Sequence, residues 1–136
     1  MEMLIVVAII AILIAIAIPT FASSLNKARV ATDEANIRSG YATVMATVMT
    51  SDSYSAEGTA ETKTYSLNKD GSVTEGASGT YTCQGNTNGE VDVAGQTITG
   101  GWSKGATVSY EYVGATGKVQ IKVGTTTQTG GTSSNG

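Results

Sequence analysis

Residues 3–18 read MLIVVAIIAILIAIAI, sixteen apolar residues without a break. As a helix this stretch would be about 24 Å long, and the hydrocarbon core of a membrane is about 30 Å thick. A helix that is apolar on every side must also be covered on every side. Residues 51–136 offer little cover, because only 23 of these 86 residues are apolar. The sequence therefore favours a membrane helix over the buried helix of a soluble core.

A cleaved secretory signal is an alternative interpretation of the same stretch. Such a signal carries a basic segment before its apolar core and a small-residue cleavage site after it. Here Glu2 precedes the apolar run, and the first basic residue is Lys27. The charge pattern therefore favours a retained helix.

The composition of the chain excludes several kinds of function. The absence of histidine excludes His-based acid–base catalysis and His metal ligation. The single cysteine, Cys83, excludes an intrachain disulfide and a Cys-cluster metal site, and we expect it to be a small buried hydrophobe. A net charge of −3 with eight Lys and Arg argues against a nucleic-acid-binding surface. We expect no enzyme activity, no cofactor and no nucleic acid bound directly by the chain.

Two acidic turns carry oxygen ligands of the kind that Ca²⁺ prefers. Asp70 is followed by Gly71, and Glu90 lies close to Asp92. Neither run contains five or six spaced ligands, so we interpret both as solvated turns and expect no metal.

Helical signals continue after the apolar stretch. Pro19 lacks a backbone donor and predicts a kink. Residues 20–50 then follow the pattern of an amphipathic helix, with Gly40 as its weak point. The apolar face, which we expect to pack on the rest of the chain, consists of Val30, Ile37, Tyr41, Val44 and Val48.

Two pairs of opposite charges lie four residues apart in this second part of the helix. Arg29 pairs with Asp33, and Glu34 pairs with Arg38. Such pairs suit a solvated face, so we expect all four side chains to be exposed.

The remainder reads as short antiparallel strands joined by turns. The clearest hairpin is 107–113 with 118–123, in which apolar and polar residues alternate. Trp102 could be an exposed contact or a core residue, and we favour the core. Segment 51–61 reads as a connection. The weaker strand candidates are 63–67 with 72–75, 80–83, and 90–93 with 96–99.

These signals divide the chain into three parts. Residues 1–24 form a hydrophobic helix, and residues 25–123 form a head of amphipathic helix and antiparallel strands. Residues 124–136 lack large apolar side chains, so we expect a flexible polar tail. The predicted fold class is α+β, with a long N-terminal helix, kinked near Pro19, packed on a small antiparallel sheet.

The stretch from Glu2 to Pro19 resembles the mature N-terminus of type IV pilins and of the related secretion pseudopilins. In that family a Phe begins the mature chain after cleavage at a glycine, a Glu follows four positions later, and an apolar helix leads to a Pro. Segment 27–49 also resembles pilins of Gram-positive gut anaerobes. The resemblance implies a pilin-like fold and a subunit that forms filaments.

The chain departs from the family pattern in three respects. Only Met1 precedes Glu2, so we expect the leader and the first mature residues to lie outside this numbering. Ala11 stands where a glycine is common, and alanine favours helix, so any melted segment would begin nearer Pro19. A single Cys83 cannot form the C-terminal disulfide of many Gram-negative pilins.

The resemblance implies a major structural subunit of a type IV pilus. Its partners would be copies of itself, the prepilin peptidase, the pilus assembly machinery and, before assembly, the cytoplasmic membrane. After assembly it would lie in an extracellular surface filament that serves motility or adhesion. Glu2 would pair with the N-terminal amine of a neighbouring subunit, and small residues would let helices approach closely. The expected assembly residues are Glu2, Ala8, Ala11, Ala15 and Pro19.

Two alternatives stay open at this point. The chain could be a pseudopilin of a type II secretion or competence system, which forms a short piston. It could also be an extracellular binding domain for which the helix is only an anchor.

Overall fold

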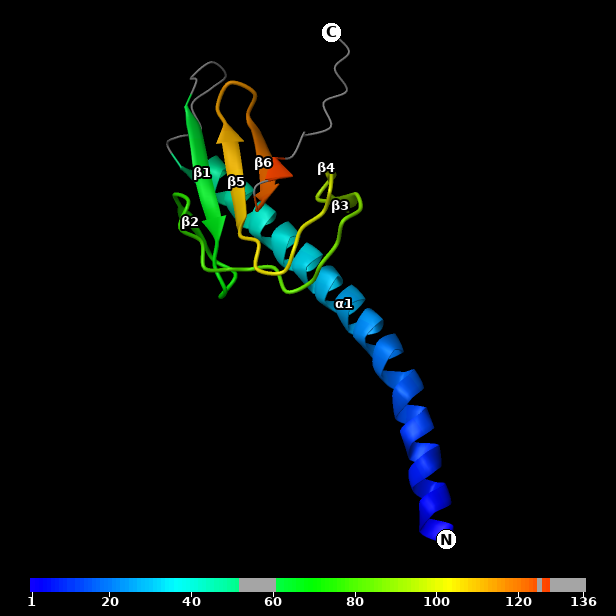
Figure 1. Cartoon of the computed structure of the whole chain (residues 1–136). Helices are drawn as coiled ribbons and strands as arrows, with labels where there is room; N and C mark the ends of the chain where they lie inside the picture. The colour runs from blue at the N-terminus through cyan, green and yellow to red at the C-terminus, as the bar shows by residue number, and fades with distance from the viewer. Residues whose placement is uncertain (52–60, 125, 128–136) are drawn as a thin grey trace.

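The computed structural model describes residues 1–51, 61–124 and 126–127. One long helix packs on a small antiparallel sheet (Figure 1), which confirms the predicted α+β fold. The predicted connection 51–61 falls almost entirely outside the described residues. The elements are α1 (Glu2–Thr50), β1 (Thr62–Leu67), β2 (Val73–Glu75), β3 (Val91–Val93), β4 (Gln96–Ile98), β5 (Val108–Val113), β6 (Lys118–Val123) and β7 (Thr126–Thr127).

The helix α1 continues through Pro19 without a break. Proline removes the hydrogen bond that its N–H would donate to the carbonyl of Ala15. At the next residue the Thr20 hydroxyl donates to the Ile16 carbonyl at 3.2 Å. Figure 1 shows α1 bending between the head and the N-terminal end. The chain thus keeps one continuous helix between two very different environments.

The main sheet has the strand order β2-β1-β5-β6-β7, and every neighbouring pair is antiparallel. The predicted hairpin is present as β5 and β6, which pair from Val108 with Val123 to Val113 with Lys118. Short loops join β1 to β2 and β5 to β6, and in the first of them Gly71 has a φ of +83°, which favours glycine. One face of the sheet is buried and the other is polar, because residues alternate along β5 and β6.

The hairpin of β3 and β4 forms a separate two-stranded sheet. Its loop is Ala94-Gly95, and both residues have positive φ, at 52° and 78°. Positive φ at both central residues is the geometry of a type I′ turn, which fits the right-handed twist of a hairpin.

One expectation about extended structure is corrected. The strand predicted at 80–83 is wrong, because this segment forms only an isolated bridge between Thr82 and Thr107. The backbone N–H groups of the next two residues, Gln84 and Gly85, donate to Asp33 on α1 instead. In the tail expected to be flexible, Thr126–Thr127 forms β7 on β6, while residues 128–136 lie outside the described residues.

The core lies between the upper half of α1 and the inner face of the sheet. From the helix, Ile37 and Val44 are fully buried and Val48 is nearly so, whereas Val30 and Tyr41 are half-buried against the same cluster. The sheet and its loops contribute the other buried apolar side chains, which are Tyr65, Leu67, Tyr81, Cys83, Val93, Ile98, Trp102, Val108, Tyr110, Tyr112, Val119, Ile121 and Val123. The positions expected for Cys83 and Trp102 are confirmed.

Gly40 is a point of close approach between the helix and the sheet. A Cβ at this position would lie 2.2 Å from the Tyr110 hydroxyl oxygen and 2.9 Å from Leu67 Cδ1. The buried Tyr110 hydroxyl donates to the Ile37 carbonyl at 2.7 Å. The glycine that weakens the helix locally therefore makes room for a contact that holds helix and sheet together.

We expect Gly40→Ala to destabilise the head by about 1–3 kcal/mol, since overpacking outweighs the gain of about 1 kcal/mol in helix propensity. Urea unfolding of the full chain in mild detergent, followed by the fluorescence of Trp102, measures this change. Ser39→Ala is the matched control on the same turn and should stay within about 0.5 kcal/mol of the parent. Adding Tyr110→Phe should restore part of the loss; a neutral Gly40→Ala would contradict the packing described here.

Candidate assembly surface and its attachment to the head

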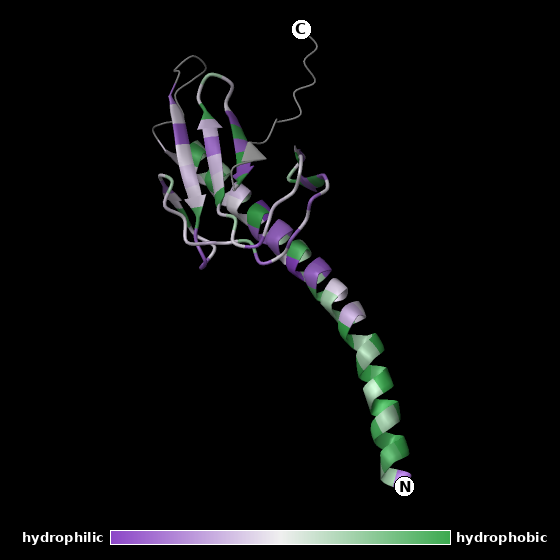
Figure 2. Ribbon diagram, in the orientation of Figure 1, coloured by the Kyte–Doolittle hydropathy of each residue, from purple (hydrophilic) through white to green (hydrophobic). Residues whose placement is uncertain are grey.

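The first 25 residues form a stem that no other part of the described chain covers. In Figure 2 the ribbon of this half of α1 has the colour of hydrophobic residues over nearly its whole length, whereas the head is a mixture of hydrophobic and hydrophilic residues. Among the described residues, every large apolar side chain that is exposed lies on the stem, apart from Met49. These stem side chains are Met1, Met3, Leu4, Ile5, Val6, Val7, Ile9, Ile10, Ile12, Leu13, Ile14, Ile16, Ile18, Phe21 and Leu25.

The stem gives α1 the length and composition needed to cross a membrane, and within the described residues it is the one helix that has them. An N-terminal signal sequence shares these properties. The structure thus shows an apolar helix able to act as a membrane anchor or as a signal sequence.

Four of the expected assembly residues lie along one face of the stem. Ala8, Ala11, Ala15 and Pro19 follow each other at spacings of three, four and four, which places them above one another on a helix. All four are exposed. The stripe offers a shallow strip where another helix can approach closely.

Glu2 lies in the first turn of α1 and is exposed. A carboxylate in the first turn interacts favourably with the positive end of the helix dipole. Ala8 lies six positions further along the helix, so the side chain of Glu2 leaves the helix away from the small-residue face. The structure therefore does not bring Glu2 together with the four other expected residues.

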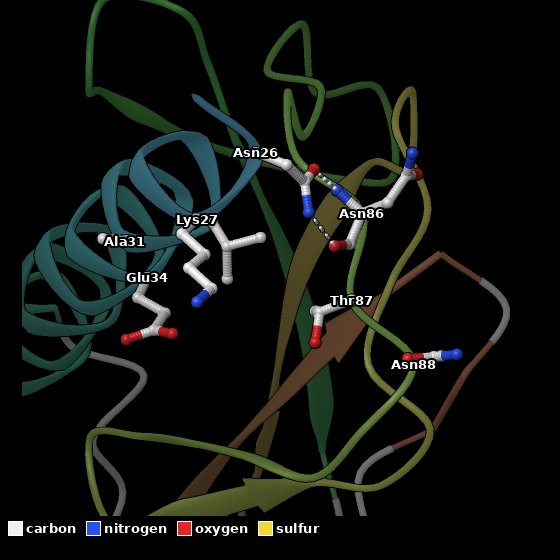
Figure 3. Close-up of a pocket in the computed structure, with 8 residues that line it drawn as sticks. Asn26, Lys27, Ala31, Glu34, Asn86, Thr87 and Asn88 are labelled. Carbon is white, nitrogen blue, oxygen red and sulfur yellow. Dashed lines mark hydrogen bonds between the residues drawn. The ribbon is translucent and has the colours of Figure 1, made fainter. Parts of the chain in front are cut away.

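The stem ends where Asn26 meets the head. The Asn26 side-chain amide donates to the Asn86 carbonyl and accepts from the Asn86 N–H, both at 2.9 Å (Figure 3). The Asn86 side-chain oxygen in turn accepts from the Lys104 N–H at 2.6 Å. These bonds connect the helix to two loops of the head.

An open polar hollow of about 370 Å³ lies beside this junction. Figure 3 shows that α1 supplies one wall and the loop after Gly85 supplies the other. The residues that line it are Asn26, Lys27, Val30, Ala31, Glu34, Asn86, Thr87 and Asn88.

Asp33 corrects the expectation for the charged face of the helix. The exposed pair with Arg29 is wrong, because the Asp33 side chain is completely buried. One carboxylate oxygen accepts from the Tyr81 hydroxyl at 2.6 Å. Its partner oxygen accepts from the Gly85 N–H at 2.8 Å and from Trp102 Nε1 at 3.2 Å, and the Gln84 N–H lies 3.0 Å from both.

Within the described residues, Asp33 thus accepts from four donors, and none of them is a Lys or Arg side chain. Burying a carboxylate is costly unless hydrogen bonds replace its hydration. Hydrogen bonds to a charged acceptor are shorter and stronger than neutral ones. The carboxylate therefore fastens the loops at Tyr81, Gln84 and Trp102 to one point of α1.

Neighbouring groups support this attachment. The Tyr81 hydroxyl also accepts from Asn36 Nδ2 at 3.0 Å, one turn further along α1. A Cβ at Gly85 would lie 2.7 Å from the backbone nitrogen of Val30, so only glycine lets the loop come this close to the helix.

The sequence contained an indication that Asp33 is buried, but its spacing of four from Arg29 favoured an exposed ion pair instead. Asp33 lies three residues after Val30 and four before Ile37, so it belongs to the apolar face itself. A carboxylate within an apolar stripe indicates a buried acceptor.

Burial changes the titration of the groups around this point. Desolvation, followed by the nearby Asp33 charge, raises the pKa of the Cys83 thiol to about 12. Desolvation and the bond to Asp33 raise the pKa of Tyr81, and desolvation raises that of Tyr110. Since folding raises these pKa values, the stability that neutral groups contribute is complete below their unfolded pKa values and is lost as the pH rises through the folded ones.

In the two acidic turns considered for calcium, Asp70 and Asp92 accept hydrogen bonds from nearby residues of the chain. Asp70 accepts from the Ser72 N–H at 3.0 Å and from its hydroxyl at 2.6 Å, and these bonds lower the pKa of Asp70. Asp92 accepts from the Thr97 hydroxyl at 2.7 Å. The part of the chain that the structure describes contains no group of three or more Cys, Asp and Glu side chains placed to hold a metal ion.

A scan against profiles of protein families, a search of curated proteins and a search of solved structures each find no match to this chain. The architecture, a long apolar N-terminal helix on a small antiparallel sheet, is compatible with a pilin-like fold.

We expect Asp33→Asn to destabilise the head by about 3 kcal/mol or more, because it removes the charge and turns an amide donor toward buried donors. Urea unfolding monitored by Trp102 gives the free energy, and hydrogen exchange should show faster opening at Gln84 and Gly85. Glu34→Gln, on the next residue of α1, is the matched control and should be nearly neutral. Equal effects of the two substitutions would contradict the role of Asp33.

We expect Cys83 to react with an alkylating reagent at pH 8 roughly 100-fold more slowly in the folded chain than in urea, because little thiolate forms and the sulfur is buried. Mass spectrometry over time measures both rates. Similar rates in the two states would show that the sulfur is accessible.

Proposed function

We propose that this protein is the structural subunit of a filament of the type IV pilin kind. The stem lies in the cytoplasmic membrane before assembly and packs against the stems of other copies afterwards. The observation that carries the proposal is the stem itself, which exposes apolar side chains on all sides while the head buries its own. The role is structural and involves no catalysis.

The dimensions of the stem suit a membrane. The exposed apolar surface extends past Pro19 to Phe21 and Leu25, which are 67% and 37% exposed. A helix of about 24 residues spans about 36 Å, enough for a hydrocarbon core of about 30 Å. A helix limited to residues 3–18 would be shorter than the hydrocarbon core, whereas the longer stem is not.

The surface of the stem also suits a second copy. Below the head, an apolar recess of about 360 Å³ lies between the side chains of Ala17, Ile18, Phe21, Ala22 and Leu25. Together with the stripe from Ala8 to Pro19, it offers small and large side chains that a neighbouring helix can interlock with. Because such a contact joins two different faces, its repetition along an axis produces a helical filament.

The attachment at Asp33 supports the same proposal. A filament needs each head to keep a constant position on its stem, since otherwise neighbouring heads could not repeat the same contact. The bonds of Asp33 and Asn26 fix two loops, at 84–86 and at Trp102, to α1 at the base of the head. Glu2, by resemblance, pairs with the N-terminal amine of a neighbouring subunit and sets the register between stems.

Replacement of Glu2 tests the proposal. In the cells that produce the protein, we expect Glu2→Ala and Glu2→Gln to leave normal amounts of membrane-inserted subunit and to abolish filaments, because a lost charge leaves the partner amine unpaired. Electron microscopy and mass spectrometry of sheared surface material give the readout. Glu34→Gln, a carboxylate on the same helix within the head, is the control and should leave filaments intact.

A second replacement separates a filament subunit from an anchored binding domain. Exchanging residues 3–18 for an unrelated apolar helix of equal length keeps the anchor and removes the specific stem surface. We expect membrane insertion to persist and filaments to be lost. Normal filaments in both experiments, or the absence of this chain from native filaments, would overturn the proposal; short pistons across the envelope would indicate a pseudopilin.

A further inference from the structure

Among the residues that the structure describes, the outer edge of β6 is only partly paired with another strand. Along its inner side β6 pairs with β5 over its full length. On the outer side β7 pairs only with Lys122 and Val123. A strand edge with free backbone groups is a template for pairing with a strand of another chain.

A side chain occupies the rest of this edge. Gln96 Nε2 donates to the Val119 carbonyl at 2.6 Å, and Gln96 Oε1 accepts from the Ile121 N–H at 2.9 Å. A carboxamide carries the same donor and acceptor as a peptide group, so it can take the place of a strand. Together, Gln96 and β7 bind the outer edge of β6 at Val119, Ile121, Lys122 and Val123.

The hairpin of β3 and β4 holds this carboxamide in place. Gln96 is the first residue of β4 and is half-buried. Val93 and Ile98, on either side of it, are completely buried in the core. The side chains of Val93 and Ile98 hold the hairpin on the core, and this places Gln96 where it makes the two bonds to β6.

We propose that Gln96 closes the β6 edge against the β6 edge of a second copy of this chain. A second copy is the fitting partner because two identical edges pair antiparallel about a two-fold axis, each completing the other. The opposite edge of the sheet is protected differently, since β2 is only three residues long. The closed edge confines self-association to other surfaces, and it does so whether or not the stems form filaments.

The test compares three variants of the full chain in detergent, at concentrations where the parent has a constant mass by light scattering. Gln96→Ala and Gln96→Met remove the two bonds, and Gln96→Met retains the side-chain volume. Thr97→Ala is the matched control on the same hairpin, since it removes a bond to Asp92 and leaves the β6 edge closed. We expect both Gln96 variants to dimerise, with Trp102 still buried, and Thr97→Ala to keep the parental mass.

Hydrogen exchange identifies the surface that pairs. In the parent, the Ile121 amide should be protected. In associated Gln96→Ala it should stay protected, because the second copy replaces Gln96, and on dilution to the monomer it should exchange roughly five- to tenfold faster. An unprotected Ile121 in the parent, or rapid exchange at Ile121 in the associated variant, would overturn the proposal.

Three other results would also overturn it. Parental mass in both folded Gln96 variants would mean that the edge needs no closure. Association of Thr97→Ala to the same extent would place the effect in the hairpin as a whole. Loss of the folded head in both Gln96 variants would show that Gln96 maintains the hairpin instead of closing an edge.

Discussion

The buried carboxylate of Asp33 is the constraint on which the rest of the head depends. It carries its charge inside the protein, and only converging hydrogen bonds make that burial tolerable. The donors come from segments 48 to 69 residues further along the chain. Because Asp33 lies on a rigid helix, these loops can satisfy it only in one position. The same interaction therefore arranges the loops and fixes the head on α1.

A second constraint follows from using one helix for two tasks. The upper half of α1 presents a narrow stripe to the sheet, and glycine at position 40 lets the two surfaces meet closely. The lower half presents apolar groups in all directions (Figure 2). Since the helix continues through Pro19, the position of the head is transmitted directly to the stem. A rigid connection of this kind suits the proposed filament, in which each copy must present the same surfaces.

Sequence patterning predicted the elements whose signals are local. The apolar stem follows from an unbroken apolar run, and the packing stripe around Ile37 and Val44 and the hairpin of β5 and β6 follow from hydrophobic period. The strand predicted at 80–83 failed because the amides that follow it, at Gln84 and Gly85, bond to the helix. Asp33 was misplaced for a related reason. A spacing of four to Arg29 describes neighbours on a free helix, whereas the position within the stripe decided that the side chain is buried.

The sequence by itself determined that this chain has an apolar stem, an amphipathic continuation and an antiparallel head, because each depends on the period of residues close together in the chain. The tertiary structure alone decided which contacts are made by the residues that do not fit those patterns. Asp33 has its donors, Gly40 has the Tyr110 hydroxyl, and Gln96 has the edge of β6. Each of these contacts joins residues far apart in the chain, so it exists only once the helix has docked on the sheet.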